Sequence, residues 1–291
     1  MKTIKYDRNV YGDKKTYTMI QQEKDGVEYL TFPAFSSTGL VEHFFSTRIG
    51  GVSKGDCATM NFSFTRGDER EAVLENYRRA AGLLHCGMED FVCSDQTHTT
   101  NIRVVTDADR GKGVLRERDY RDIDGLITRE PGIMLVTYYA DCVPLFFLDP
   151  VQQAVGLAHS GWRGTCAKMG QHMVHAMKKQ FGTDEKDLLV GIGPSICREC
   201  YEVSKDVAEA FEEAFPDPAV WKRFLFPLSG EKYHLDLWEA NRQIFLEAGL
   251  LPEQILISGI CTSCNSSVLF SHRASHGKRG NLAAFMGLRK P

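Results

Sequence analysis

The chain has 291 residues, of which 43% are hydrophobic and 25% are charged. This length is enough for one large domain or two small ones around a buried core. The 35 lysine and arginine residues face 38 aspartate and glutamate residues, which gives a net charge of −3. Such a balance predicts no basic surface for nucleic acid and favours a small-molecule partner.

The first twenty residues alternate charged and apolar positions and lack the apolar core of a signal peptide. No apolar run approaches the ~20 residues that cross a bilayer. We therefore expect a cytoplasmic protein without membrane contact, whose nine cysteines are mostly free thiols or metal ligands. The sequence leaves the oligomeric state open.

Short apolar runs with polar flanks predict the strands of a sheet-rich core. In chain order they cover residues 42–47, 102–105, 125–128, 133–139, 143–148, 154–158, 188–192 and 255–258. Asp68 and Asp236 each precede a helical stretch and have a glutamate three residues later, as in a capping box. A third helix is predicted over residues 165–180, with its methionines on one buried face and Gly182 at its end. Because several strands precede this helix, a mixed-sheet α/β sandwich is favoured over a regular doubly wound fold.

Polar residues end two neighbouring strands of this predicted sheet. Asp141 and Cys142 interrupt "TYYADCVPLFFLDP", and His159 follows "VQQAVGLA". If the strands pair, Cys142 and His159 enter one cleft, and His98 of "QTH" is a candidate third member. Such a set would hold Zn²⁺ and leave one position for water, whose pKa zinc lowers to ~7. Asp141 would carry a proton or orient a ligand.

Two Cys-x-x-Cys pairs, at residues 197–200 and 261–264, have the spacing found in structural zinc sites. The gap between the pairs is much longer than in a compact zinc ribbon, and no basic residues cluster nearby. Buried, inert thiols are therefore the favoured interpretation, and a structural zinc site is the alternative.

Two loops have the composition of anion-binding loops. Arg48 lies in "STRIGGVS", where a glycine pair exposes backbone N–H groups. Arg163 lies in "GWRGT", at the predicted start of a helix. No G-x-G-x-x-G, G-x-x-x-x-G-K-[ST], H-E-x-x-H or G-x-S-x-G motif is present, which excludes the simplest dinucleotide, NTPase, zincin and serine-hydrolase interpretations.

The motifs "STRIGGVS", "TMNFS", "QTH", "DGLIT", "ADCVP", "AHSGWRGT", "GIGPSI", "CYEV" and "LDL" occur in one order. As a set they resemble the YfiH-like family, also called the laccase-domain or polyphenol-oxidase-laccase family, some members of which are named peptidoglycan editing factors. The resemblance runs from about Phe35 to the C-terminus. It implies a catalytic domain over residues 35–291, with residues 1–34 as a peripheral segment.

The resemblance further implies a mixed-sheet α+β sandwich related to cysteine-hydrolase-like folds, with zinc bound by His98, Cys142 and His159. It implies purine nucleoside phosphorylase activity, with adenosine deaminase and methylthioadenosine phosphorylase activity, so purine nucleosides and phosphate are the expected partners. We expect Arg48 and Arg163 to clamp phosphate and Asn61 of "TMNFS" to contact substrate. Near the C-terminus the chain departs from the family pattern: His272, Ala274 and Asn281 replace Tyr, Arg and Arg, although Arg273 fits.

Three alternatives remain open at this point. The first is a metal-free amide hydrolase of cell-wall peptide precursors, with Cys142 as nucleophile and His159 as base. The second is a copper-dependent phenol oxidase, since Cu²⁺ binds such ligands tightly, but nine scattered histidines without a His-x-His pair do not suit a multicopper site. The third is a non-enzymatic protein that zinc stabilises.

Overall fold

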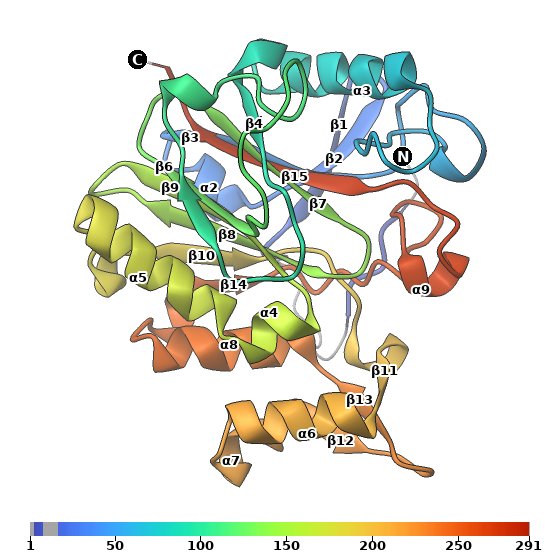
Figure 1. Ribbon diagram of the computed structural model, residues 1–291, viewed down its shortest axis with the longest axis vertical. Coiled ribbons are helices and arrows are strands. Elements are labelled where there is room, and N and C mark those ends of the chain that lie inside the picture. The colour runs from blue at the N-terminus through green and yellow to red at the C-terminus, as the bar shows by residue number, and fades with distance from the viewer. Residues whose placement is uncertain (1–2, 8–16, 291) are drawn as a thin grey trace.

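The computed structural model describes residues 3–7 and 17–290. Two six-stranded mixed sheets lie at its centre (Figure 1). In spatial order, the first sheet contains β1 (Ile20–Lys24), β2 (Val27–Thr31), β3 (Val41–Ser46), β15 (Leu282–Leu288), β7 (Met134–Tyr139) and β4 (Phe91–Cys93). The second contains β14 (Ile255–Ile257), β10 (Leu189–Ile192), β8 (Val143–Asp149), β9 (Ala154–Ser160), β6 (Gly125–Thr128) and β5 (Ile102–Val104).

Helices cover the outer face of each sheet, so the molecule has four layers (Figure 1). Helix α3 (Arg70–Leu83) packs on the first sheet, where Tyr77 contacts Phe91 and Phe285. The second sheet is covered by α4 (Trp162–Cys166), α5 (Met169–Phe181) and α8 (Leu237–Glu247). Because strands β8 and β9 are buried along their whole length, they show continuous apolar runs rather than alternation.

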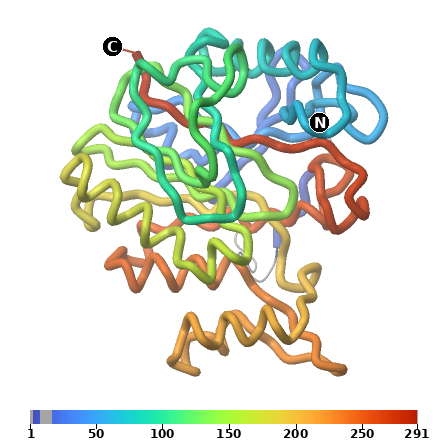
Figure 2. The backbone as a smooth tube through the Cα atoms, in the orientation of Figure 1, coloured from blue at the N-terminus to red at the C-terminus, as the bar shows by residue number. Residues whose placement is uncertain are grey.

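A third, three-stranded sheet forms an outlying part of the chain (Figure 2). It contains β11 (Glu202–Ser204), β13 (Lys232–Leu235) and β12 (Leu225–Pro227), accompanied by α6 (Lys205–Ala214) and α7 (Pro218–Trp221). The other helices of the described residues are α2 (Pro33–Ser36), α9 (His272–Ser275) and the 3-10 helices η1 (Gly55–Cys57), η2 (Met88–Asp90), η3 (Asp107–Asp109), η4 (Glu185–Asp187), η5 (Arg198–Cys200) and η6 (Pro252–Gln254). Within the described part of the chain, no helix combines the length and apolar character needed to cross a bilayer.

The predicted sandwich is confirmed, and each of the eight predicted strands is present to within two residues. Two details of the helices are corrected. Helix α3 begins after Glu69, because the Asp68 carboxylate accepts hydrogen bonds from the Glu69 N–H and from Asn61 rather than capping the helix. The single helix predicted over residues 165–180 is two helices, since Lys168 has a left-handed φ of 55° between α4 and α5.

The described N-terminal residues contribute strands at the edge of the first sheet, where β1 and β2 form an antiparallel hairpin. The predicted division into a peripheral segment of residues 1–34 and a catalytic domain of residues 35–291 stays a prediction. The methionine face of α5 lies in the core, as expected, because Met169, Met173 and Met177 are all fully buried.

Candidate metal centre and substrate cavities

The three predicted metal ligands meet in the structure. The ligand atoms of His98, Cys142 and His159 all lie within 4.8 Å of one another. The two imidazole rings are 4.9 Å apart between centroids and nearly perpendicular. His98 lies on the connection between β4 and β5, Cys142 on the connection between β7 and β8, and His159 within β9. Two of the three therefore lie where the chain passes from one sheet to the other.

Asp124 fixes the position of both histidines. Its buried carboxylate lies 2.8 Å from Nδ1 of His159 and accepts a backbone hydrogen bond from His98 at 3.1 Å. The N–H groups of Thr97 and Thr99 also donate to it, each at 3.0 Å. These bonds hold the His98 loop in a tight turn, in which His98 itself has a left-handed φ of 68°. With Nδ1 of His159 bonded to the carboxylate, its Nε2 is available to a metal, an arrangement common among metal-ligating histidines.

Strand pairing and a sharp turn position Cys142. Strands β8 and β9 are antiparallel, and Pro144 lies opposite His159. Just before β8, Asp141 has a left-handed φ of 89°. The Asp141 carboxylate accepts hydrogen bonds from the Thr262 hydroxyl at 2.6 Å and from the Arg273 N–H at 2.7 Å. It is thus bonded to the C-terminal loops rather than to the histidines.

The electrostatics of the cluster favour a thiolate beside an imidazolium. Burial would raise the pKa of the Cys142 thiol, but His159 and His98 beside it lower that pKa to about 6. Burial would likewise lower the pKa of His159, but Cys142 and Asp124 raise it to about 9. Two imidazoles and a thiolate are a donor set that suits zinc, so the residues fit the metal that the family resemblance implies.

Two cavities of contrasting chemistry meet at the cluster. One has a volume of about 320 Å³ and a lining of mixed polar and apolar surface; we call it the polar cavity because Arg66, Arg118 and Arg279 line it. The other is mainly apolar, has a volume of about 300 Å³ and is lined by Trp162, Tyr201, Ile196 and Leu237, among others. Both cavities are also lined by His98, Cys142 and Arg279. The cluster and Arg279 therefore form the boundary between them.

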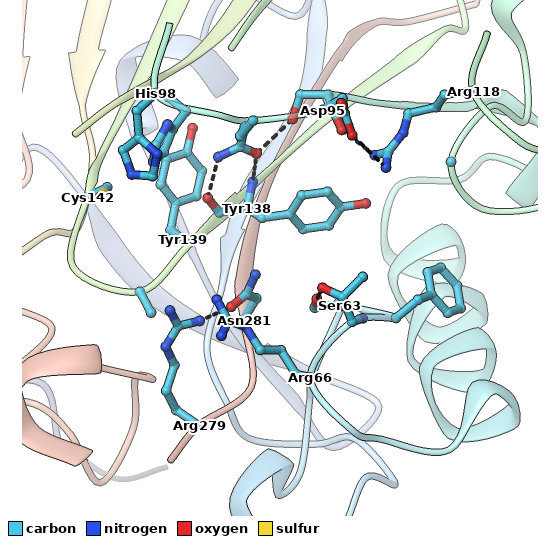
Figure 3. Close-up of a pocket in the computed structure, with 17 residues that line it drawn as sticks. Ser63, Arg66, Asp95, His98, Arg118, Tyr138, Tyr139, Cys142, Arg279 and Asn281 are labelled. Carbon is cyan, nitrogen blue, oxygen red and sulfur yellow. Dashed lines mark hydrogen bonds and ion pairs between the residues drawn. The ribbon is translucent and has the colours of Figure 1, made fainter. Parts of the chain in front are cut away.

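The polar cavity contains a concentration of positive charge. Figure 3 shows Arg66 and Arg279 on one side of it and Asp95 with Arg118 on the other. Arg118 is paired with Asp95 at 2.9 Å. Arg279 is different: within the described part of the chain, its buried Nε has no hydrogen-bond partner. Burial and the neighbouring Arg66 lower the pKa of Arg279 to about 10. An anion in this cavity would relieve both effects.

The structure places the predicted substrate-binding residues outside both linings. The Arg48 guanidinium donates to two loop carbonyls at 2.9 and 3.1 Å. The Asn61 side chain is buried, and its Oδ1 accepts from the Asn281 N–H at 2.9 Å. The Arg163 guanidinium lies 4.3 Å from the centroid of the Trp162 ring. Arg48 and Asn61 therefore hold loops together, and Arg163 covers an aromatic residue of the apolar cavity.

Sequence reasoning did not identify Asp124, Arg66, Arg279 or Tyr201 as site residues. Asp124 begins the "DGLIT" motif, and a carboxylate directly before a buried strand was an available signal. Arg66 and Arg279 lie more than two hundred positions apart in the chain. Only the tertiary fold brings them to one cavity, so their sequence context carries no such signal.

The fold and the site define an α/β protein in which two histidines and a cysteine lie close enough together to hold a metal ion. The family model for the multi-copper polyphenol oxidoreductase laccase matches residues 42–289, and the chain belongs to this family. The purine nucleoside phosphorylase YlmD of Geobacillus stearothermophilus is 39% identical over 251 residues, which cover 84% of this chain and 89% of that protein. A purine nucleoside phosphorylase of Bacteroides thetaiotaomicron is 37% identical over 94% of this chain and 100% of its own length.

Solved structures agree with this assignment. The crystal structure of YlmD from Geobacillus stearothermophilus superposes with a TM-score of 0.86 at 37% identity and covers 94% of this chain and 100% of its own. The hypothetical protein YfiH of Bacillus licheniformis also gives a TM-score of 0.86, at 33% identity, over 92% of this chain and 99% of its own. The curated relatives bear phosphorylase names, which supports an enzymatic role for this chain.

Proposed function

We propose that this chain is a zinc-dependent purine nucleoside phosphorylase that also deaminates adenosine and cleaves methylthioadenosine. One observation carries the proposal: the His98, Cys142 and His159 cluster lies at the junction of an arginine-lined cavity and an aromatic one. The names of the similar proteins point the same way. Purine nucleosides and phosphate are the substrates that such a pair of cavities would accommodate.

The two cavities divide the substrates by their chemistry. A purine has two flat aromatic faces, which fit against Trp162 and Tyr201 in the apolar cavity. Phosphate fits the polar cavity, because Arg66 and Arg279 line it and the buried Nε of Arg279 has no hydrogen-bond partner among the described residues. Because Arg279 borders both cavities, the ribose between them would lie next to its guanidinium.

This arrangement would serve phosphorolysis by positioning and by charge. A phosphate oxygen attacks the anomeric carbon of the ribose while the bond from that carbon to the base breaks. The base leaves with the bonding electrons and takes up a proton, and the products are ribose 1-phosphate and the free purine. Arg66 and Arg279 would hold the phosphate in line, and the apolar cavity would exclude water, which competes as a nucleophile.

His98, Cys142 and His159 would hold the metal, and Asp124 would keep both histidines oriented toward it. Zinc, when bound, supplies a Lewis acid and activates water at neutral pH, as deamination of adenosine requires. Cu²⁺ would bind the same three residues, since it exceeds zinc in affinity for such ligands. The apolar lining would also accept the methylthio group of methylthioadenosine.

The proposal is tested with metal-analysed protein incubated with inosine or adenosine, with and without phosphate. Ribose 1-phosphate that appears only with phosphate marks the phosphorylase, and ammonia released without phosphate marks the deaminase. Replacement of Cys142 by alanine should abolish both activities together with the metal. If the metal-loaded protein yields neither product, the proposed function is wrong.

One alternative also has a structural observation in its favour. Cys142, His159 and Asp124 are arranged as a nucleophile, a base and an orienting carboxylate, which is the pattern of a cysteine hydrolase. Such an enzyme would cleave amides in cell-wall peptide precursors without a metal. Full amidase activity after exhaustive chelation, with covalent labelling of Cys142, would support it over the phosphorylase.

The multicopper oxidase suggested by the family's description requires several copper sites. Among residues 3–7 and 17–290, the groups able to bind a metal include one cluster with two histidines and none with three. A trinuclear copper centre depends on many more histidines than that. We therefore do not extend that activity to this chain.

A further inference from the structure

A second group of metal-ligand residues lies outside the proposed catalytic centre. The sulfur atoms of Cys197, Cys200, Cys261 and Cys264 all lie within 4.8 Å of one another. The sulfur atoms of Cys200 and Cys264 are 3.5 Å apart. All four are free thiols in the structure. The two Cys-x-x-Cys pairs, which are separated by sixty residues in the sequence, thus form one cluster.

Strand pairing explains how the two pairs meet. β10 and β14 run parallel at one edge of the second sheet. Beyond their ends, Ser195 and Cys261 form a further parallel bridge, in which the Ser195 N–H donates to Ile260 at 3.2 Å and its carbonyl accepts from Thr262 at 3.1 Å. The chain segments that carry the two pairs therefore leave the sheet side by side. The parallel pairing therefore brings the two Cys-x-x-Cys pairs together in space, as the short sequence spacing does in a compact zinc ribbon.

The cluster has the dimensions of a tetrahedral metal site. Four sulfur atoms at a zinc–sulfur distance of about 2.3 Å would lie roughly 3.8 Å from one another. The observed separations are compatible with this arrangement after small movements of the side chains. The Cys261 sulfur also accepts backbone hydrogen bonds from Cys197 at 3.3 Å and from Cys264 at 3.4 Å. Such bonds stabilise a thiolate and orient it as a ligand.

We propose that Cys197, Cys200, Cys261 and Cys264 bind a structural zinc ion, distinct from the metal held by the His98 cluster. Four thiolates complete the coordination of zinc and leave no open position, so this site would be structural rather than catalytic. Cys197 and Cys261 are buried, with 3% exposure each, whereas Cys264 is exposed. The ion would therefore enter from solvent on the side of Cys264. It would link the two chain segments that follow β10 and β14.

The position of this site gives it an effect on the substrate cavity. Tyr201, which follows Cys200 directly, lines the apolar cavity. Thr262, which follows Cys261, donates to the Asp141 carboxylate at 2.6 Å. Arg273 donates to the carbonyl oxygen of Cys200 at 3.2 Å and also lines the cavity. A zinc ion that ties the two segments together would thus hold one wall of the apolar cavity in place.

The proposal is tested by counting metal ions. Protein purified under reducing conditions in the presence of zinc is measured by native mass spectrometry and by elemental analysis. We expect two zinc ions per wild-type chain and one in a Cys200→Ser, Cys264→Ser variant. The His98→Ala, Cys142→Ala variant should also retain one, and the Cys86→Ser variant, which changes a half-buried thiol outside the cluster, should retain two.

Cobalt substitution tests the same site with all four cysteines present. The His98→Ala, Cys142→Ala variant reconstituted with Co²⁺ should show intense thiolate-to-cobalt charge-transfer absorption typical of tetrahedral sulfur coordination. This measurement does not depend on whether the cysteine variants fold, nor on whether the enzyme is a phosphorylase. One zinc per wild-type chain, lost completely in the His98→Ala, Cys142→Ala variant, would overturn the proposal. A second outcome would also overturn it: a wild-type mass lower than that of the fully reduced chain by one or two pairs of hydrogen atoms, with no such deficit in the Cys200→Ser, Cys264→Ser variant. This result would identify disulfides.

Discussion

The Asp124 carboxylate lies 2.8 Å from Nδ1 of His159 and is buried together with it. The same carboxylate accepts the backbone N–H of His98. One buried charge thus sets both the ring orientation of one proposed ligand and the loop conformation of another.

We expect Asp124→Asn to weaken metal binding by about 10- to 100-fold, because an amide is a poorer acceptor and does not fix the His159 tautomer. Competition with a chromophoric chelator measures this change. Asp122→Asn is the matched control, since Asp122 is exposed and its carboxylate accepts the hydroxyl of Thr97 in the same loop at 2.8 Å. Equal affinity in the Asp124→Asn variant and the wild type would contradict the role given to Asp124.

Gly161 provides a steric test of the cluster. A Cβ atom at this position would lie 2.9 Å from Cδ2 of His98 and 3.1 Å from the Cys142 sulfur. Both separations are shorter than van der Waals contact, so Gly161→Ala should displace the ligands and cost about 1–3 kcal/mol of stability. Gly164→Ala, whose Cβ would meet its nearest neighbour at 3.6 Å, should leave metal content unchanged. Metal analysis and thermal unfolding of both variants check this contrast.

Asp141 is expected to position the C-terminal loops rather than transfer a proton, because its carboxylate accepts from Thr262 and Arg273. Asp141→Asn should lose about 1–3 kcal/mol of stability, since an amide N–H would oppose the Arg273 N–H. The pH profile of kcat should keep its shape, while the KM for the nucleoside rises. Loss of one limb of the pH profile, with unchanged stability, would instead identify Asp141 as the proton carrier.

Arg279→Ala should raise the KM for phosphate at least about tenfold. A tenfold change in affinity corresponds to ~1.4 kcal/mol, and a hydrogen bond to a charged group contributes more free energy than that. Arg279→Lys should recover part of the affinity. Initial rates over a range of phosphate concentrations provide the measurement. The Arg48→Ala and Arg163→Ala variants serve as comparisons: if these raise the phosphate KM and Arg279→Ala does not, the sequence-based assignment is correct and the cavity-based one is wrong.

His43 should make the stability of the fold sensitive to acid. Burial lowers its pKa to about 3 from the usual 6.5, and its Nε2 accepts the Phe32 N–H at 2.9 Å. Between these pKa values the unfolded chain binds more protons than the folded one. The contribution of His43 to the free energy of unfolding is therefore fully present above pH 6.5. It decreases as the pH falls toward 3, by up to ~1.4 kcal/mol per pH unit.

Urea unfolding across this pH range measures the free energy of unfolding at each pH. We expect this free energy to fall less steeply with decreasing pH in His43→Gln than in the wild type. A glutamine can still accept the Phe32 N–H but does not titrate. His85→Gln, at an exposed position, is the control and should follow the wild-type slope. Parallel curves for His43→Gln and the wild type would show that His43 does not govern the acid response.

The parts of the fold that were predictable depend on local pattern. The eight apolar runs each identified a strand, and the apolar signal is continuous in β6, β8 and β9 because these strands are buried on both faces. β15 was missed although its seven residues are all buried, and its place between β3 and β7 depends on pairing with distant strands. Lys168 divided a helix that side-chain periodicity alone predicted as continuous, since periodicity is insensitive to one left-handed residue.

The site was predictable where its residues lie at the ends of predicted strands. Cys142 and His159 come from adjacent strands, so sequence order alone suggested that they meet. His98 was a candidate from its place in the sequence before a predicted strand, the family resemblance implied the same residue, and the structure brings it to the other two. Arg66 and Arg279 lie on loops, and the cysteine pairs meet only through the parallel β10–β14 edge. Such juxtapositions depend on the complete topology.

The connections that carry Cys142 and His98 each lead from one central sheet to the other. A metal ion bound at this point would cross-link the two central sheets of the sandwich. Sliding of one sheet over the other would separate the donor atoms, so we expect metal occupancy to resist that shear. Removal of the ion should then loosen the whole sandwich, and hydrogen exchange in strands far from the cluster should accelerate along with that near it.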